Sequence, residues 1–271
     1  MKPRYRVGIG GLGAIGMKIA RALDAGIPGL TLTAVSARDR LAAAQRLVGF
    51  TGVPRVMPLE ALAEHADVIV ECAPASVFDT VAVPAVEAGR IFMPLSCAAL
   101  LSRPGLIERA KETGGRIIVP TGALVGLDAV RAAAEQDGIR TVTITSVKPP
   151  RTLKYSPFLL AKGVDVNAFD KPTKIFEGSA REASEGFPAN VNIVAALSLA
   201  GIGPDATRVA IWVDPDAERN VHTVEVDANS TRFSMTIEGI PSAENPSSGL
   251  LPPLSAIAAL RALTGTLHVG S

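Results

Sequence analysis

Six residues near the start of the chain have the spacing of a dinucleotide-binding loop. Gly11-Leu12-Gly13-Ala14-Ile15-Gly16 follows a short β-rich run at 5–9 and precedes a helical pattern at 17–23. In such a loop the first glycine permits a tight turn, the second lets a pyrophosphate approach the backbone, and the third lets the helix pack closely. The helix N-terminus then faces the phosphates. The alternative is a glycine-rich turn that binds nothing. We predict that the cofactor is bound by Gly11, Gly13, Ala14, Ile15 and Gly16.

The end of the second predicted strand, at 30–36, bears on the choice of cofactor. An acidic residue there, about twenty residues beyond the glycines, binds the ribose hydroxyls of NAD. This chain has Ser36-Ala37-Arg38-Asp39 instead. Ser36 carries no charge to repel a 2′-phosphate, and Arg38 has the charge to pair with one, so NADP is expected to be accepted. Asp39 keeps NAD open, and a solvated Arg38 is the alternative.

His222 is the candidate acid–base group among the three histidines of the chain. It lies inside an alternating run at 220–227, where a strand would hold its side chain and adjust its pKa. A core or surface histidine without a catalytic role is the alternative. His65 ends a predicted helix and His268 lies close to the end of the sequence, so both are expected to be solvated.

Other polar residues supply weaker candidates. Lys148, Arg151 and Lys154 follow a predicted strand at 141–147, and Lys148 and Arg151 are the candidates for binding substrate carboxylates, with a solvated basic edge as the alternative. Cys72 and Cys97 have no histidine nearby in sequence to activate a thiolate, so they are expected to be buried fillers. No Cys or His pair has metal-ligand spacing, and we expect no metal.

Strands and helices alternate through the first 120 residues. Besides the first unit of strand, helix and strand, helices are predicted at 39–47, 59–65, 77–88 and 104–113, and strands at 68–72, 90–95 and 116–120. This order is typical of a Rossmann-type doubly wound parallel sheet. After residue 126 the pattern changes, with alternating polar and apolar strands at 141–147, 208–214, 220–227 and 231–238 and a helix at 190–200.

We therefore expect an α/β fold, a doubly wound parallel sheet followed by a smaller α+β domain with a mixed sheet. Residues 1–121 would form the dinucleotide-binding domain, with a C-terminal helix in 246–271 packing back on it. Residues 122–245 would form the substrate, catalytic and dimerisation domain, because an open mixed sheet commonly pairs with a copy of itself. A homodimer is expected.

Composition excludes several classes of partner. Among the 271 residues, 27 basic side chains balance 26 acidic ones, and no basic run is present to bind nucleic acid. No run of eighteen apolar residues suggests a membrane span, and the glycine-broken N-terminal stretch is not expected to be a signal peptide. Two cysteines do not make a disulfide scaffold, so the cytoplasm is the expected compartment. The expected partner is a small molecule.

Several segments together resemble the L-aspartate dehydrogenase family, in the family's order and across most of the chain. They are the glycine loop, Thr121-Gly122-Ala123-Leu124-Val125-Gly126-Leu127-Asp128, Lys148-Pro149-Pro150, Phe187-Pro188-Ala189-Asn190-Val191-Asn192 and Asn220-Val221-His222. The resemblance implies a Rossmann domain followed by a smaller α/β domain, with NAD or NADP as cofactor. It implies oxidation of a dicarboxylic amino acid, L-aspartate, to iminoaspartate, which feeds NAD biosynthesis. By motif, Ala123 and Asn190 would contact the cofactor and His222 would be the catalytic acid–base.

Two departures from the family pattern keep other substrates open. The family has Asn-Pro-Lys-Thr-Ser where this chain has Asn245-Pro246-Ser247-Ser248-Gly249. The family also usually has a glycine a few residues after the histidine's strand, where this chain has Asp227-Ala228-Asn229. The alternatives are a related NAD(P)-dependent dehydrogenase or reductase for another small acid, or a non-catalytic protein that senses the dinucleotide.

Overall fold

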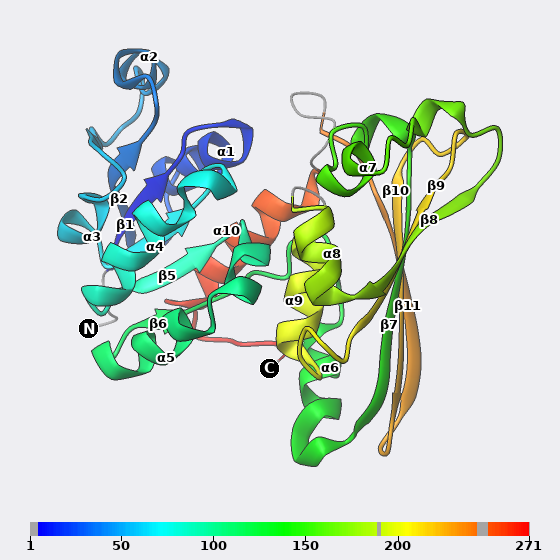
Figure 1. The fold of residues 1–271 in the computed structure, drawn as a ribbon. Helices are drawn as coiled ribbons and strands as arrows, with labels where there is room; N and C mark the ends of the chain where they lie inside the picture. Colours follow the sequence, from blue (N-terminus) through cyan, green and yellow to red (C-terminus); the bar gives the residue numbers. More distant parts are fainter. Residues whose placement is uncertain (1–4, 189–190, 243–248, 271) are drawn as a thin grey trace. The chain divides into compact units, whose positions relative to one another are not determined.

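The protein forms two compact units in a computed structural model that describes residues 5–188, 191–242 and 249–270 (Figure 1). The first unit is made of Met1–Ser96, Arg103–Pro120 and Pro252–His268. The second unit is made of Cys97–Ser102, Thr121–Leu251 and Val269–Ser271. Within the described residues, no helix combines the length and the hydropathy needed to cross a lipid bilayer.

The first unit is built on a six-stranded sheet in the order β3-β2-β1-β4-β5-β6, and all of its strand pairs are parallel. The strands are β1 (Tyr5–Gly10), β2 (Leu30–Ser36), β3 (Arg55–Val56), β4 (Val68–Glu71), β5 (Ile91–Pro94) and β6 (Arg116–Ile117). The helices are α1 (Ala14–Asp24), α2 (Arg40–Arg46), α3 (Leu62–His65), α4 (Phe78–Glu87), α5 (Pro104–Thr113) and α10 (Leu251–Ala262), with a 3₁₀ turn η1 (Ala75–Val77). This strand order confirms the predicted doubly wound sheet.

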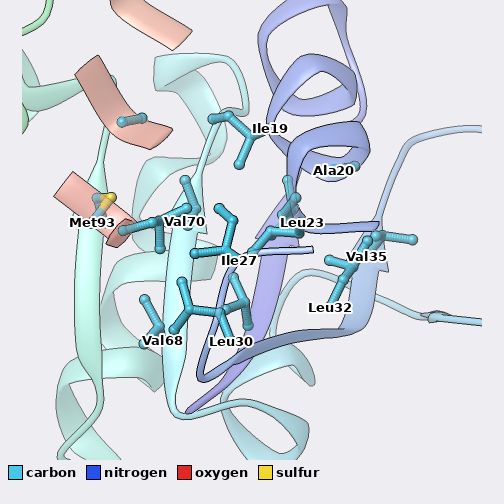
Figure 2. Close-up of a cluster of buried hydrophobic side chains, with 14 of the residues drawn as sticks. Ile19, Ala20, Leu23, Ile27, Leu30, Leu32, Val35, Val68, Val70 and Met93 are labelled. Atoms are coloured by element: carbon cyan, nitrogen blue, oxygen red, sulfur yellow. The ribbon is translucent and has the colours of Figure 1, made fainter. Parts of the chain in front are cut away.

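The core of the first unit contains side chains from α1 and α10, which lie far apart in the sequence. Helix α1 places Ile19, Ala20 and Leu23 on one face, at the spacing of three and four residues that a helix requires. Figure 2 shows these side chains gathered with those of the central strands. Ala256 and Leu260 of α10, one turn apart, are fully buried in the same cluster. Sequence-distant helices therefore complete one core.

The second unit is built on a five-stranded mixed sheet in the order β11-β10-β7-β9-β8, in which only β7 and β9 run parallel. The strands are β7 (Ile139–Lys148), β8 (Thr173–Ser179), β9 (Arg208–Val213), β10 (Asn220–Ala228) and β11 (Arg232–Gly239). The helices are α6 (Leu127–Ala134), α7 (Pro157–Ala161), α8 (Ala180–Gly186) and α9 (Asn192–Ala200), and the 3₁₀ turns are η2 (Cys97–Ser102), η3 (Glu135–Asp137), η4 (Pro150–Thr152) and η5 (Val166–Ala168). The mixed sheet confirms the predicted fold class.

The two faces of this sheet differ in burial. Val142 and Ile144 of β7 and Val224 of β10 are buried, while Thr143 and Thr145 between them are only partly covered. Helices α6, α8 and α9 run along one side of the sheet (Figure 1) and contact one another through α9. Alternating side chains thus give the sheet one covered face and one open face.

No element was predicted at residues 173–186, where the structure has β8 and α8. Strand β8 pairs on one side only, and its charged residues Lys174 and Glu177 obscure the apolar alternation. Helix α8 begins with a capping box, because Ser179 Oγ accepts from the Glu182 amide and the Glu182 carboxylate accepts from the Ser179 amide. This Ser-x-x-Glu signature was available in the sequence.

Candidate functional site

The glycine loop between β1 and α1 packs so tightly that side chains are excluded at two positions. Gly11 has φ +105°, and a Cβ there would lie 2.7 Å from the Cys72 carbonyl oxygen at the end of β4. A Cβ on Gly16 would lie 1.9 Å from the Gly11 carbonyl oxygen. Helix α1 therefore sits directly on its own preceding loop, which only glycine permits.

Gly13 differs from these two, because a Cβ there would meet no atom within 4 Å. Gly13 is the N-cap of α1, and no side chain caps the helix. The first backbone N–H groups of an 11-residue helix, including those of the half-buried Ala14 and Ile15, therefore lie beside open space. This combination of donors and room fits the pyrophosphate of a dinucleotide.

After the end of β2, the cationic side chain of Arg38 is exposed, whereas the carboxylate of Asp39 is engaged in a hydrogen bond. Ser36 is buried, and its carbonyl accepts a 2.9 Å hydrogen bond from the Gly11 amide. Arg38 is exposed. Asp39 caps α2 by accepting from the Ala42 amide at 2.9 Å. The carboxylate that kept the NAD alternative open thus already has a structural partner.

Glu71 is a buried carboxyl group at the carboxyl end of β4, which pairs with Gly10. It accepts hydrogen bonds from the amides of Ala73 at 2.8 Å and Ser96 at 3.0 Å, and from Ser96 Oγ at 3.2 Å. Burial raises the pKa of Glu71 to about 7 against the lowering effect of these donors. Glu71 was not among the site residues predicted from the sequence, although a lone acid after the apolar run Val68-Ile69-Val70 is a signal.

A group of polar side chains lies at one end of the covered face of the second sheet, and we call Ser146, Lys148, Asn220 and His222 the polar corner. Strand register pairs His222 of β10 with Ser146 of β7. Ser146 Oγ and His222 Nδ1 are 2.9 Å apart, and both residues are buried. The bond fixes the imidazole through one nitrogen and leaves Nε2 for a ligand.

Burial controls protonation in the polar corner. Burial, with the nearby Lys148 charge, holds the pKa of His222 well below its ordinary value of 6.5. Burial also lowers the pKa of Lys148 to about 8. Lys148 is 4% exposed, and within the described part of the chain no carboxylate pairs with it. At neutral pH the corner therefore holds a neutral imidazole beside a buried ammonium.

The other sequence candidates are placed differently. Arg151 is exposed and donates to the Glu218 carbonyl at 2.7 Å, so its present partner is backbone. Ala123 is half-buried in a turn closed by a 3.1 Å hydrogen bond from the Leu124 amide to the Thr121 carbonyl. Asn190 lies outside the described residues, as do Ser247 and Ser248.

The remaining candidates have ordinary surroundings. Cys97 is buried in η2, where its Sγ donates to the Asn192 carbonyl at 3.1 Å. His65 is half-buried and His268 is exposed. Among the described residues, no three side chains of the metal-binding types cluster closely enough to hold an ion.

Comparison with known proteins assigns the chain to a family. The sequence profile described as aspartate dehydrogenase, C-terminal, matches residues 128–263. An L-aspartate dehydrogenase from Bradyrhizobium diazoefficiens is 51% identical over 98% of this chain and 94% of its own length. The chain belongs to the L-aspartate dehydrogenase family. Another member of this family, from Methanocella arvoryzae, is 41% identical over 98% of this chain and 100% of its own length.

The first unit is similar to a cofactor-binding domain. The profile described as homoserine dehydrogenase, NAD binding domain, matches residues 11–120. The crystal structure of an aspartate dehydrogenase from Thermotoga maritima has a TM-score of 0.73, with 22% identity over 98% of this chain and 100% of that chain. At this identity the likeness shows the fold alone. As a member of the L-aspartate dehydrogenase family with an NAD-binding domain, the protein is an NAD(P)-dependent amino-acid dehydrogenase.

Proposed function

We propose that this chain oxidises L-aspartate to iminoaspartate, which then hydrolyses to oxaloacetate and ammonia. The observation that carries the proposal is the polar corner, where a neutral imidazole and a buried cation lie together. An amino-acid oxidation needs both, a base for the ammonium and a positive charge for a carboxylate. The 51% identity to a protein named L-aspartate dehydrogenase supports this substrate.

The first unit would hold the cofactor. Gly11 and Gly16 shape the loop, and Gly13, Ala14 and Ile15 offer backbone donors to the pyrophosphate. Ser36 and Arg38 would lie at the adenosine ribose, and the exposed Arg38 beside an engaged Asp39 favours acceptance of NADP as well as NAD. When bound, the nicotinamide ring accepts a hydride. Ala123 and Asn190 are the further proposed cofactor contacts.

His222 would act as the general base. Its Nε2 takes one proton from the substrate ammonium, so the nitrogen lone pair becomes free to form the C=N bond. The Cα–H bond breaks with both electrons leaving as hydride, and the product is an iminium with one proton held by the imidazole. Ser146 holds Nδ1 throughout this step. The same histidine would then assist attack of water on the iminium carbon.

Lys148 would bind a substrate carboxylate, because a buried ammonium without a carboxylate partner gains most from one. Arg151 is the second proposed carboxylate ligand, and its guanidinium would have to exchange the Glu218 carbonyl for substrate.

The test is the initial rate of cofactor reduction at alkaline pH with L-aspartate, using NAD and NADP in turn. Wild type is compared with His222→Ala and, as a matched control, with His268→Ala, an exposed histidine. We expect His222→Ala to lose roughly 100- to 10,000-fold in rate with cofactor affinity unchanged, as for other general bases. The control should retain the wild-type rate. Cofactor binding without turnover of L-aspartate by the wild type would contradict the proposal and support a sensor.

Three wider proposals accompany this function. The product would enter NAD biosynthesis, and the enzyme would work in the cytoplasm, in keeping with a chain whose two cysteines form no disulfide. The protein would be a homodimer, with the open face of the second sheet as the interface. Trp212, the single tryptophan, lies half-buried on β9, so its fluorescence can report dilution-induced dissociation.

A further inference from the structure

Asn220 is the one residue of the polar corner that has no role in the proposed reaction. It precedes His222 by two residues on β10, so both side chains are on the same face of the sheet. Its Oδ1 is buried and has no hydrogen-bond partner within the described residues. Buried polar atoms are nearly always paired, so an orphaned acceptor calls for a donor from elsewhere.

The neighbouring residues do not supply that donor. On β11 the residue paired with Asn220 is Gly239, which has no side chain. On β7, the strand on the other side of β10, Val147 pairs with Val221. Extending this antiparallel register by one residue places Lys148 opposite Asn220. Ser146 and His222 are engaged with each other. The corner thus presents three separate functions on one face, which are a cation, a proton acceptor and an unpaired amide oxygen.

A ligand that satisfies all three carries an anionic oxygen for Lys148 and an N–H donor for Asn220 on neighbouring atoms. An α-amino acid has this arrangement, with its carboxylate and its amino group on one carbon. A dicarboxylate without nitrogen meets the needs of Lys148 and leaves Asn220 Oδ1 orphaned. The site therefore has the means to separate the two classes.

We propose that Asn220 binds the amino group of the substrate through Oδ1 and thereby selects amino acids over the corresponding acids without an amine. This inference rests on the proposed function, since it assigns a residue to the same site. The contact persists through the reaction, because the ammonium, the amine and the iminium each retain at least two N–H bonds. It also directs the amine so that the proton leaving for His222 does not compete with the bond to Asn220.

The experiment compares L-aspartate with succinate, which has the same two carboxylates and no amine. Dissociation constants are measured by calorimetry on the protein saturated with NADH, so that no turnover occurs, and initial rates with L-aspartate are measured in parallel. Asn220→Leu removes the acceptor at similar volume, and Asn220→Asp keeps an oxygen at the same position. Thr223→Val is the matched control, because Thr223 lies on the opposite face of β10, where its hydroxyl bonds to that of Thr236.

We expect Asn220→Leu to weaken L-aspartate binding by roughly 10- to 100-fold, the loss typical of a hydrogen bond to a charged group, and to leave succinate binding within about threefold. Asn220→Asp should retain a preference for L-aspartate over succinate, and Thr223→Val should match the wild type. Equal losses for both ligands, or no loss for either, would overturn the inference.

The same data separate this inference from the proposed function. Wild-type turnover of L-aspartate with an unaltered ligand ratio in Asn220→Leu would sink the role of Asn220 and leave the function standing. Selective binding of L-aspartate that disappears in Asn220→Leu, without turnover in the wild type, would sustain the amine contact and refute the oxidation. Wild type that binds succinate as well as L-aspartate would refute the amine contact outright.

Discussion

Each unit buries a side chain that can carry a full charge at the carboxyl end of a strand, and the surroundings of these two side chains are opposite. Glu71, at the end of β4, accepts three hydrogen bonds from Ala73 and Ser96. Lys148 lies at the end of β7, and burial lowers the pKa of its ammonium group. A buried charge that the fold satisfies serves the fold, whereas one that the fold leaves unsatisfied is available to a ligand.

The same contrast extends to the surrounding backbone. The close contacts of Gly11 and Gly16, near Glu71, form without a ligand, because they join backbone atoms of the chain itself. The polar corner around Lys148 still contains the orphaned oxygen of Asn220. We therefore expect substitution of Gly16 or Glu71 to act mainly on stability, whereas substitution in the polar corner acts on substrate binding.

The largest effect is expected from Gly16→Ala. The new methyl group would overlap the Gly11 carbonyl oxygen, so α1 must move from its loop, at a cost of at least about 3 kcal/mol in the free energy of unfolding. Gly13→Ala is the matched control, because a Cβ there meets nothing within 4 Å. It should unfold like the wild type in urea while dinucleotide affinity falls at least about tenfold. Equal stability of the two variants would refute the packing argument.

Lys148→Met should raise stability while it destroys substrate binding. The folded pKa of about 8 lies below the ordinary 10.5, so the charged form is penalised in the folded state. At about 1.4 kcal/mol per pKa unit, the penalty approaches about 3 kcal/mol below pH 8 and fades as pH rises toward 10.5. Urea unfolding at pH 7 and pH 10 measures this gain. Loss of stability in the variant at pH 7 would show that the ammonium has a partner.

Glu71→Gln should give a smaller effect with a different pH dependence. The folded pKa of about 7 lies above the ordinary 4.5, so ionisation is penalised in the folded state, and the wild type loses stability as pH rises from about 4.5 to about 7. The upper limit is again about 3 kcal/mol, offset by hydrogen bonds that a glutamine cannot accept on both sides. Unfolding curves across this range should converge at acid pH. Parallel curves would mean that folding does not shift the pKa of Glu71.

Ser146→Ala should have the smallest effect on stability, about 1 kcal/mol, because it removes one hydrogen bond. We expect kcat for L-aspartate to fall by roughly tenfold with little change in KM, since the imidazole loses its fixed tautomer. Ser146→Thr keeps the hydroxyl and should recover most of the rate. Nitrogen NMR shifts of His222 report the tautomer directly, and unaltered shifts in Ser146→Ala would remove Ser146 from the argument.

The sequence predicted the glycine loop far better than the polar corner. The glycine loop depends on consecutive residues and on backbone geometry, so its pattern and its context are visible locally. The partnership of Ser146 with His222 joins residues 76 positions apart and depends on the register of two strands. The alternation around residue 146 indicated a half-covered strand, but no local signal specifies which residue of another strand it faces.

Other parts of the site were beyond sequence reasoning for different reasons. Glu71 follows an apolar run, which by itself predicts only a buried strand. Its three hydrogen-bond donors come from the loops after β4 and β5, and no local pattern shows that these loops meet. Arg151 was grouped with Lys148 by proximity in sequence, yet one is exposed and the other buried, because the chain turns through η4 after Pro149. Charge alone does not distinguish a solvated cation from a buried one.

The placement of α10 has a consequence for synthesis of the protein. Ala256 and Leu260 are fully buried in the core of the first unit, and Thr264 Oγ1 donates to the Pro28 carbonyl at 2.7 Å, across 236 positions. The N-terminal unit therefore has an open hydrophobic face while the ribosome is still making the middle of the chain. Its final consolidation must wait for residues near 260, so contacts of long sequence separation close the fold last.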